Sequence, residues 1–219
     1  MPLCRIFFNL GQQLASPSVL ALDSGGDRPL STQLREDDLV RRYLEGDSAS
    51  AEALVEAYWD RVYAYAYRLT LNAADAEDIT QETFLRAFRG IDSYSPEGQF
   101  KAWLLRIATN LVLDLRKSPK AREVAVDMNQ QNAVLVEESP EAQMMSRELV
   151  SALWVAIHEL AREQQVALVL RTIERFDYPQ IAEILNVKES TARWHLYEAR
   201  RMLRKKLAKR FDLEGQQDE

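Results

Sequence analysis

Three long stretches of this 219-residue chain contain neither glycine nor proline. They are residues 47 to 89, 99 to 118 and 141 to 178. Because glycine and proline interrupt helices and also close tight turns between strands, their absence favours long helices over closely turned strands. An apolar fraction of 47% is enough to form hydrophobic cores, either in one domain or in two small ones. The sequence therefore predicts a folded, all-α protein.

Local capping signals and apolar periodicity divide the first half of the chain into four predicted helices. Gly46 and Asp47 end the first helix and can cap the second, while Asn72 begins the third and Gly90 ends it. The fourth helix is predicted at about residues 100 to 116. The apolar residues expected to form the core are Leu34, Leu39, Val40, Tyr43 and Leu44 in the first helix, Ala53, Leu54, Ala57, Tyr58, Val62, Tyr65 and Leu69 in the second, Ile79, Phe84, Leu85 and Phe88 in the third, and Trp103, Leu104, Ile107, Leu111 and Leu115 in the fourth.

The second half of the chain predicts a linker followed by a smaller helical domain. Residues 118 to 139 lack periodicity and are mainly polar, which is typical of a linker. Ser139 can then act as an N-cap, with Pro140 at the first position of a helix. Further helices are expected at about residues 162 to 175, 179 to 185 and 189 to 209.

These patterns give an expected organisation of five segments. Clustered glycine, proline and serine near the start predict a mobile N-terminal extension, and a wrongly assigned translation start is the alternative. The segments are residues 1 to 32 for the extension, 33 to 117 for the first helical domain, 118 to 139 for the linker, 140 to 211 for the second helical domain and 212 to 219 for a C-terminal tail.

Charge is unevenly distributed along the chain. The formal net charge is −6, yet Glu198 is the only acid between residues 191 and 210. A basic segment within an acidic protein indicates a local polyanionic partner, such as nucleic acid. The basic residues of this segment are Arg193, Arg200, Arg201, Arg204, Lys205, Lys206, Lys209 and Arg210.

Residues 176 to 210 have the pattern of a helix-turn-helix, in which Asn186 tolerates a left-handed turn between the two helices. The second helix keeps a polar and aromatic face that can reach bases and phosphates in a major groove. From spacing alone, a plain helical hairpin with a solvated basic face is the alternative. The inward residues are Ile181, Ala182, Ile184, Leu185, Ala192, Leu196 and Ala199, and the exposed face carries Lys188, Ser190, Thr191, Arg193, Trp194, His195 and Tyr197.

Several function classes are excluded by what the chain lacks. Cys4 is the only cysteine, so neither an internal disulfide nor a cysteine metal cluster can form, and a reducing cytoplasm is expected. With His158 and His195 as the only histidines, and no glycine-rich phosphate loop or nucleophile motif, we predict no enzyme activity, cofactor, metal or small-molecule substrate. The apolar run at residues 6 to 10 is too short to span a membrane.

Two strings of residues resemble a known family. Residues 185 to 200 read LNVKESTARWHLYEAR, which resembles the promoter-binding helix-turn-helix of extracytoplasmic-function (ECF) sigma factors, a compact branch of the sigma-70 family. The family's second region is similar to residues 75 to 88, DAEDITQETFLRAF, and to residues 100 to 110, FKAWLLRIATN. The resemblance covers about residues 33 to 210 in the family's order, and it implies two helical domains joined by a flexible linker: a four-helix promoter-melting domain (region 2) and a helix-turn-helix domain (region 4).

The third predicted helix carries acids and an amide at i, i+3 and i+4 spacing. In the family such a helix binds the clamp helices of the largest RNA polymerase subunit, so the resemblance implies binding to core polymerase. An ordinary solvated acidic face is the alternative from composition alone. The residues concerned are Asp75, Glu77, Asp78, Gln81 and Glu82, with Phe84 as apolar contact area.

The fourth predicted helix and the loop before it form a candidate site for opening DNA. Aromatic side chains can stack on bases, and Asn110 can both donate and accept hydrogen bonds at a base edge. In the family this loop and the residue at Asn110 help to capture a flipped base of the downstream promoter element. For Phe100 and Trp103, packing in the core is the alternative. The candidates are Tyr94, Phe100, Lys101, Trp103, Arg106 and Asn110.

The helix-turn-helix is implied to bind the upstream promoter element. Arg193 is ranked above His195 because an imidazole could hold a phosphate only when protonated. Trp194, His195 and Glu198 depart from the family pattern, so we expect them to set this protein's promoter preference. The candidates are Lys188, Ser190, Thr191, Arg193, Trp194, His195, Tyr197, Arg200 and Arg201.

The resulting prediction is a cytoplasmic sigma factor that directs promoter recognition, DNA melting and transcription initiation. Its implied partners are core RNA polymerase, promoter DNA in duplex and melted form, and an anti-sigma factor. The linker either follows polymerase toward the RNA exit path, as in the family, or acts only as a tether. The alternative function is a helix-turn-helix regulator that binds duplex DNA without polymerase.

Overall fold

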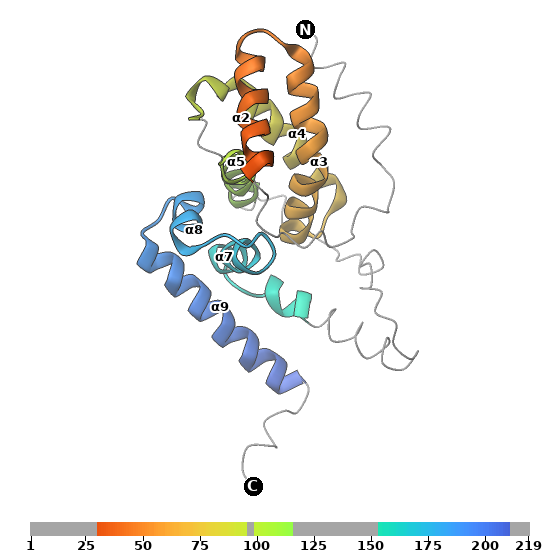
Figure 1. The fold of residues 1–219 in the computed structure, drawn as a ribbon. Coiled ribbons are helices and arrows are strands. Elements are labelled where there is room, and N and C mark those ends of the chain that lie inside the picture. Colours follow the sequence, from red (N-terminus) through yellow and green to blue (C-terminus); the bar gives the residue numbers. More distant parts are fainter. Residues whose placement is uncertain (1–29, 96–98, 116–152, 211–219) are drawn as a thin grey trace, which may run out of the picture. The chain divides into compact units, whose positions relative to one another are not determined.

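The computed structural model describes residues 30–95, 99–115 and 153–210 (Figure 1). These residues form α-helices and one short 3-10 helix, with no strand in the described ranges, which confirms the all-α prediction. The chain divides into two compact units, Met1–Val124 and Ala125–Glu219, called here the N-terminal and the C-terminal unit. The predicted linker and the helix start at Ser139 and Pro140 lie outside the described residues.

The N-terminal unit contains the four helices that the sequence predicted. Asp47 caps α3, since its carboxylate accepts a hydrogen bond from the amide of Ala49 at 3.1 Å. Asn72 caps α4 in the same way, accepting from the amide of Asp75 at 3.0 Å. The elements are α2 (Leu30–Leu44), α3 (Ser48–Thr70), α4 (Ala73–Arg89), the 3-10 helix η2 (Ile91–Ser93) and α5 (Phe100–Leu115). Only α2 differs noticeably in extent, because it begins within the predicted N-terminal extension.

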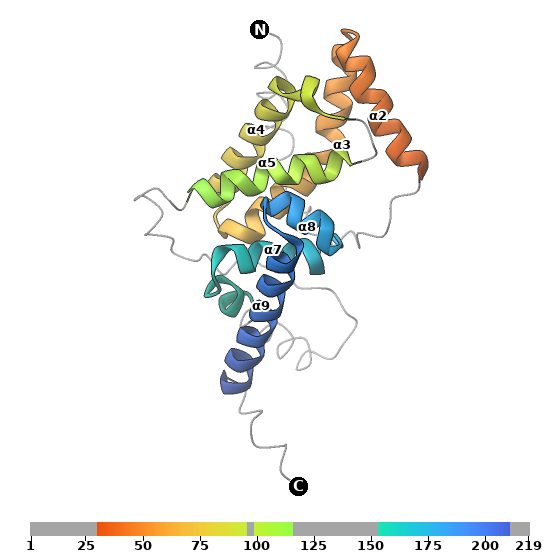
Figure 2. The same cartoon turned by 90° about the vertical axis from the view of Figure 1, so that its left-hand side faces the viewer.

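The core of this unit is built around α3, which contacts α2, α4 and α5 (Figure 2). Tyr58 and Tyr65 of α3 are fully buried, and Tyr58 packs edge-on against Phe100 with ring centroids 5.3 Å apart. A buried hydrogen bond of 2.6 Å joins the hydroxyls of Tyr65 and Thr109, and so fixes α5 on α3. The position of α5 matters for function because its outer face carries the residues predicted to bind melted DNA.

Some residues predicted to lie in the hydrophobic core are not buried. Ala57 and Leu44 are exposed, and Trp103 is only half-buried. On α5 the side chains that pack inward follow a different stripe from the predicted one, because this helix is apolar around most of its circumference and periodicity cannot then select one face. The buried residues of α5 are Phe100, Ala102, Leu104, Leu105, Ala108, Thr109 and Val112, whereas Ile107, Leu111 and Leu115 are half-buried.

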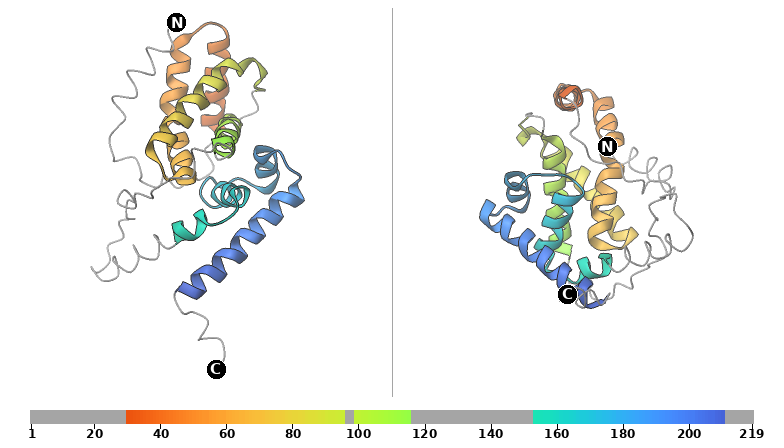
Figure 3. Two further views of the ribbon diagram at one scale, coloured as in Figure 1. Left: turned by 180° about the vertical axis from the view of Figure 1, so that it is seen from behind. Right: turned by 60° about the horizontal axis from the view of Figure 1, so that its bottom comes forward.

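The C-terminal unit has a helical segment at residues 153 to 158, followed by α7 (Arg162–Thr172), α8 (Tyr178–Leu185) and α9 (Glu189–Arg210) (Figure 3). α9 contacts both α7 and α8. Asn186 adopts the expected left-handed conformation, with φ of 54° and ψ of 47°, between α8 and α9. The helix-turn-helix prediction therefore holds at the level of the fold. One buried cluster contains Ala156, Ile157, Leu160, Leu168, Ala199 and Leu203.

α8 begins with a reciprocal capping box that the sequence analysis did not identify. The Asp177 carboxylate accepts a hydrogen bond from the amide of Gln180 at 2.9 Å, and the Gln180 side chain accepts from the amide of Asp177 at 3.0 Å. Pro179 lies in the first turn, where its missing amide proton costs no helical hydrogen bond. This box fixes the loop between α7 and α8.

Candidate nucleic-acid and polymerase interfaces

The acidic surface predicted to bind core RNA polymerase lies along α4. Glu77 and Asp78 are exposed, whereas Asp75, Gln81 and Glu82 are half-buried. Gln81 donates a hydrogen bond to the Glu77 carboxylate at 3.3 Å. The face therefore presents carboxylates to solvent and to an approaching partner. The most accessible of them are Glu77 and Asp78.

Among the residues of α4 predicted to bind core RNA polymerase, the burial of Phe84 corrects its role, whereas the role of Glu82 stays a prediction. Phe84 is 0% exposed and stacks on Trp59 with ring centroids 5.9 Å apart, so its predicted role as a contact surface is corrected to packing beneath the helix. Glu82 accepts a hydrogen bond from Arg86 Nε at 2.7 Å. This pair lies one helical turn apart, so it reduces the negative charge that Glu82 offers to a partner.

The outer face of α5 brings together three of the residues predicted to bind melted DNA. Arg106 and Asn110 are exposed and Trp103 is half-buried. Their spacing of three, four and seven residues places them on one side of the helix. Lys101, near the start of α5, is half-buried. The face thus offers a cation, an aromatic ring and an amide in one row.

Tyr94 and Phe100 lie under this row. They are 7% and 0% exposed, so the structure corrects their predicted role from contacting bases to supporting Trp103. The ring of Trp103 lies 5.1 Å from that of Tyr94 and 5.8 Å from that of Phe100, measured between centroids. Aromatic rings at these distances hold one another in place. Trp103 is therefore presented on a rigid aromatic base.

Tyr94 also connects the segment after η2 to α2. Its hydroxyl donates a hydrogen bond to Asp37 Oδ1 at 3.0 Å. Burial and the charge of Asp37 raise the pKa of Tyr94 well above its usual value, so the hydroxyl keeps its proton and remains a donor.

α9 is anchored by a line of buried residues and presents its opposite face to solvent. Ala192, Leu196 and Ala199 are buried against the unit. On the opposite side, Trp194 is 53% exposed and Tyr197 is 65% exposed. Exposed aromatic side chains that lie together on one face of a helix can form a contact surface for a partner. The same outward row includes Ser190 and Arg201, which are also exposed. Of the other predicted residues, Lys188 and Arg200 are exposed and Thr191 is half-buried.

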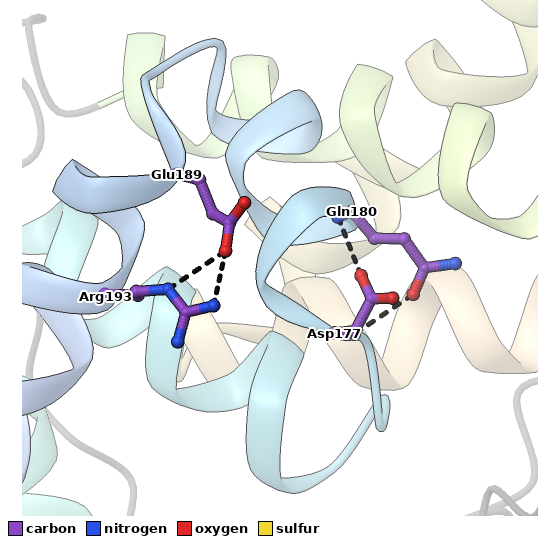
Figure 4. Close-up of polar contacts among 4 residues, drawn as sticks. All are labelled: Asp177, Gln180, Glu189 and Arg193. Atoms are coloured by element: carbon purple, nitrogen blue, oxygen red, sulfur yellow. Dashed lines mark hydrogen bonds and ion pairs between the residues drawn. The ribbon is translucent and has the colours of Figure 1, made fainter.

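Arg193 is held in a defined position at one side of this face. Its Nε donates to Glu189 Oε1 at 2.9 Å (Figure 4), and its guanidinium lies 4.2 Å from the centre of the Tyr178 ring. Arg171 approaches the same ring at 5.2 Å. Two cations thus share one aromatic ring at the start of α8. Because these contacts leave guanidinium hydrogens unused, Arg193 can still bind a phosphate or a guanine edge.

His195 lies on the flank of α9. It is half-buried, and within the described part of the chain its Nδ1 is buried without a hydrogen-bond partner. Burial lowers the pKa of His195, and the nearby Glu163 of α7 only partly opposes this effect. A lowered pKa favours the neutral imidazole, which lacks the charge needed to hold a phosphate, so His195 ranks below Arg193 as a phosphate contact. Its role at the upstream element stays a prediction.

We expect an NMR titration of the two histidines to give a midpoint for His195 below about 6.5, the ordinary value for this side chain. In the window between that midpoint and 6.5, the unfolded chain binds more protons than the folded one. The free energy of unfolding of the C-terminal unit should therefore decrease as the pH falls through this window. His195→Gln should remove that part of the pH dependence. A His195 midpoint above 6.5 would contradict the assignment.

Glu198 also shapes the charge of α9. It accepts hydrogen bonds from Arg201 Nη2 at 2.8 Å and from Nε at 3.2 Å, and this pairing raises the pKa of Arg201. Part of the charge of Arg201 is thus compensated within the helix.

In the described ranges there is no group of three or more histidine, cysteine or acidic residues that could hold a metal ion.

Comparison with known proteins decides the family. Residues 54–122 match the family description "Sigma-70 region 2", and residues 151–203 match "Sigma-70, region 4". The ECF RNA polymerase sigma-E factor of Haemophilus influenzae is 31% identical over 186 residues, which cover 81% of this chain and 98% of that protein. The chain belongs to the ECF sigma factors of the sigma-70 family.

Further relatives of this sigma factor are found in Bacillus subtilis and Mycolicibacterium smegmatis. SigW of Bacillus subtilis is 31% identical over 77% of this chain and 94% of its own length. SigE of Mycolicibacterium smegmatis is 40% identical over 75% of this chain, although the match spans only 65% of that protein.

Two solved structures share the fold. One is CnrH in complex with the cytosolic domain of CnrY, with 20% identity, a TM-score of 0.56 and coverage of 79% of this chain and 97% of that one. The other is the sigma factor RpoE with the anti-sigma factor NepR from Bartonella quintana, with 22% identity, a TM-score of 0.52 and coverage of 71% and 95%.

Some residues that shape the sigma factor's surfaces were not identified from sequence. The capping box of α8 could have been found, because aspartate followed three residues later by glutamine before an apolar run is a recognisable signature. The role of Tyr178 could not have been found in this way, since nothing local shows that its ring lies under Arg193 of the next helix.

In the described part of the chain no helix is both long and apolar enough to cross a membrane.

Proposed function

We propose that this ECF sigma factor binds core RNA polymerase through the acidic face of α4 and directs initiation through α5 and α9. The observation that carries the proposal is the placement of three rows of exposed side chains on helices whose opposite faces are buried. α4 presents Glu77 and Asp78, α5 presents Arg106 and Asn110 beside Trp103, and α9 presents Trp194 and Tyr197. We further propose that the protein acts in the cytoplasm and is not itself an enzyme.

The α5 row supports the capture of melted DNA. A base that leaves the duplex loses stacking, which costs a few kcal/mol, and stacking on an aromatic side chain returns about 1–3 kcal/mol. Trp103 can supply that surface because its ring is only half-buried. Asn110 can pair with the edge of the base, and Arg106 can neutralise a phosphate. These contacts are weak alone, so melting requires the additional contacts of polymerase.

The α9 row supports recognition of a duplex upstream element. A helix of this kind enters the major groove with its N-terminal half, where Ser190, Arg193, Trp194 and Tyr197 are located. Aromatic rings can contact thymine methyl groups, and an arginine can bind guanine with two hydrogen bonds. Because the chain carries a net charge of −6, we expect tight DNA binding only when polymerase delivers the helix to its site.

An anti-sigma factor is a further proposed partner. The RpoE structure that shares the fold was solved in complex with the anti-sigma factor NepR. A protein that covers the α4 or α9 face would prevent the contacts proposed above.

Transcription in vitro with purified core polymerase and a library of promoters tests the proposal. We expect initiation only when both core and this protein are present, and only weak duplex binding by the protein alone. Specific, tight binding to duplex DNA without core, together with no core-dependent initiation, would favour a free-standing helix-turn-helix regulator instead.

Arg193→Ala should lower recognition of the upstream element by roughly 5- to 150-fold, the range expected when about 1–3 kcal/mol of base discrimination is lost. The comparison is between promoters selected in the library and the same promoters with a scrambled upstream element. Binding to core should not change. Arg193→Lys should recover only part of the loss, since lysine cannot make the paired hydrogen bonds of a guanidinium. An equal loss on both promoter types would exclude a role in upstream recognition.

A further inference from the structure

Three arginines and one threonine line a hollow on the C-terminal unit, beside the outward face of α9. Arg171 and Thr172 belong to the last turn of α7, Arg175 to the loop after it and Arg200 to the middle of α9. None of these lining residues is acidic. We propose that this hollow binds a backbone phosphate of the upstream promoter duplex, with Arg175 as the residue that completes it. The inference rests on the proposed function and adds to it a phosphate site and two residues, Arg171 and Arg175.

The backbone at Arg175 is unusual. Its φ of 64° lies in the left-handed region, where a side chain with a Cβ atom is disfavoured and glycine is the ordinary choice. Leu71 and Asn186 have the same conformation at the ends of α3 and α8, so the conformation itself marks the end of a helix. What points to a ligand is the charge of Arg175 beside two further arginines in the hollow. In the described part of the chain, neither Arg175 nor Arg200 forms an ion pair that would explain its presence.

Arg171 is fixed in place by a backbone carbonyl and an aromatic ring rather than by a carboxylate. Its Nη1 donates to the carbonyl of Phe176 at 2.8 Å, and its guanidinium lies 5.2 Å from the Tyr178 ring centre. The hydroxyl of Thr172 donates to the carbonyl of Leu168 at 2.7 Å, so its proton is already committed. The donors available to an anion are therefore the guanidiniums. Their flat, forked N–H groups match the oxygens of a phosphate.

The register of α9 favours DNA as the source of the phosphate. Arg193 and Arg200 are seven residues apart, which is about two turns or 10.5 Å along one side of the helix. The hollow is thus in line with the residue proposed to read the upstream element. A helix in a major groove runs between two backbones, and phosphate contacts beside it fix its orientation. An acidic segment of a protein partner is the competing occupant, and the experiment separates the two.

The test measures binding of the full-length protein, assembled with core polymerase, to a fluorescent duplex promoter over a series of salt concentrations. Each phosphate contact contributes about 0.9 to the slope of log affinity against log salt. Arg175→Gln should reduce the magnitude of that slope by about this amount and lower affinity several-fold. Arg175→Gly should reduce the slope and the affinity by similar amounts. The thermal midpoint of this variant should be no lower than that of the unmodified chain, because glycine suits the left-handed backbone. Arg175→Lys should retain most of the slope.

Arg89→Gln is the matched control, since Arg89 is exposed at the end of α4, outside the two helices proposed to bind DNA, and the substitution removes the same charge. It should change the slope less than Arg175→Gln, and equal changes would overturn the phosphate site. Unchanged slopes in both Arg175 variants would also overturn it, while leaving the proposed function intact. Weaker core binding with an unchanged slope would instead identify an acidic protein segment as the occupant. If the unmodified protein forms no promoter complex with core, the proposed function itself fails.

Discussion

Replacing Glu77 and Asp78 with lysine should lower the affinity of this sigma factor for core RNA polymerase by about 100-fold. Both carboxylates are exposed on α4, so the substitutions should leave the fold intact. Each reversal turns an attraction into a repulsion at the proposed interface, and a change of about 1.4 kcal/mol per site corresponds to tenfold in affinity. The measurement is equilibrium binding of the labelled protein to core, with thermal unfolding recorded in parallel.

The control is the same charge change on a different helix. Glu52 and Glu56 are exposed on α3, and their reversal to lysine should leave core affinity within a few-fold of the original. Glu82 is a poorer choice for reversal, because it accepts a hydrogen bond from Arg86 and its loss would also disturb α4. Equal losses for the α3 and α4 variants would show that only net charge matters. No loss for the α4 variant would remove α4 as the binding surface.

Phe84→Ala should destabilise the N-terminal unit by about 3–5 kcal/mol, the usual cost of removing a buried aromatic ring. The Phe84 side chain is fully buried, stacks on Trp59 and lies 6.3 Å from the ring of Phe88. Because natural domains are stable by only about 5–15 kcal/mol, this loss would leave the unit close to unfolding. Urea unfolding followed by tryptophan fluorescence would measure it.

The contrast with Phe84→Leu distinguishes packing from contact with polymerase. Leucine fills much of the same space, so it should restore most of the stability. If Phe84 acts only by packing in the hydrophobic core, the affinity for core RNA polymerase should follow the folded fraction of the protein in both variants. A normal free energy of unfolding combined with weak core binding would restore the earlier interpretation of Phe84 as a contact residue.

The helices could be predicted because their signals are local. Asp47, Asn72 and Gly90 mark ends of helices through hydrogen bonds or conformations that involve only neighbouring residues. Which side of a helix faces inward is also readable where apolar residues form one stripe, as on α9 with Ala192 and Leu196. On α5 the same reasoning failed, because apolar residues on several sides allow more than one buried face.

The functional surfaces could be predicted only in outline for a similar reason. Residue type suggested that Tyr94 and Phe100 could stack on bases, yet the tertiary packing of α5 uses both as support for Trp103. His195 was ambiguous because its protonation depends on burial and on Glu163, a residue far away in the sequence. Contacts between separate helices decide these roles, and no local pattern reports them.

The hydrogen bond between Tyr94 and Asp37 joins two parts of the protein that are distant in sequence. Asp37 lies on α2, and Tyr94 follows η2 directly before the segment that leads to α5. A partner that displaces α2 must either break this bond or move Tyr94 with it. Because Tyr94 packs against Trp103, such a displacement would shift the ring that we propose to stack on a melted base, and α2 would then act as a lever on promoter opening.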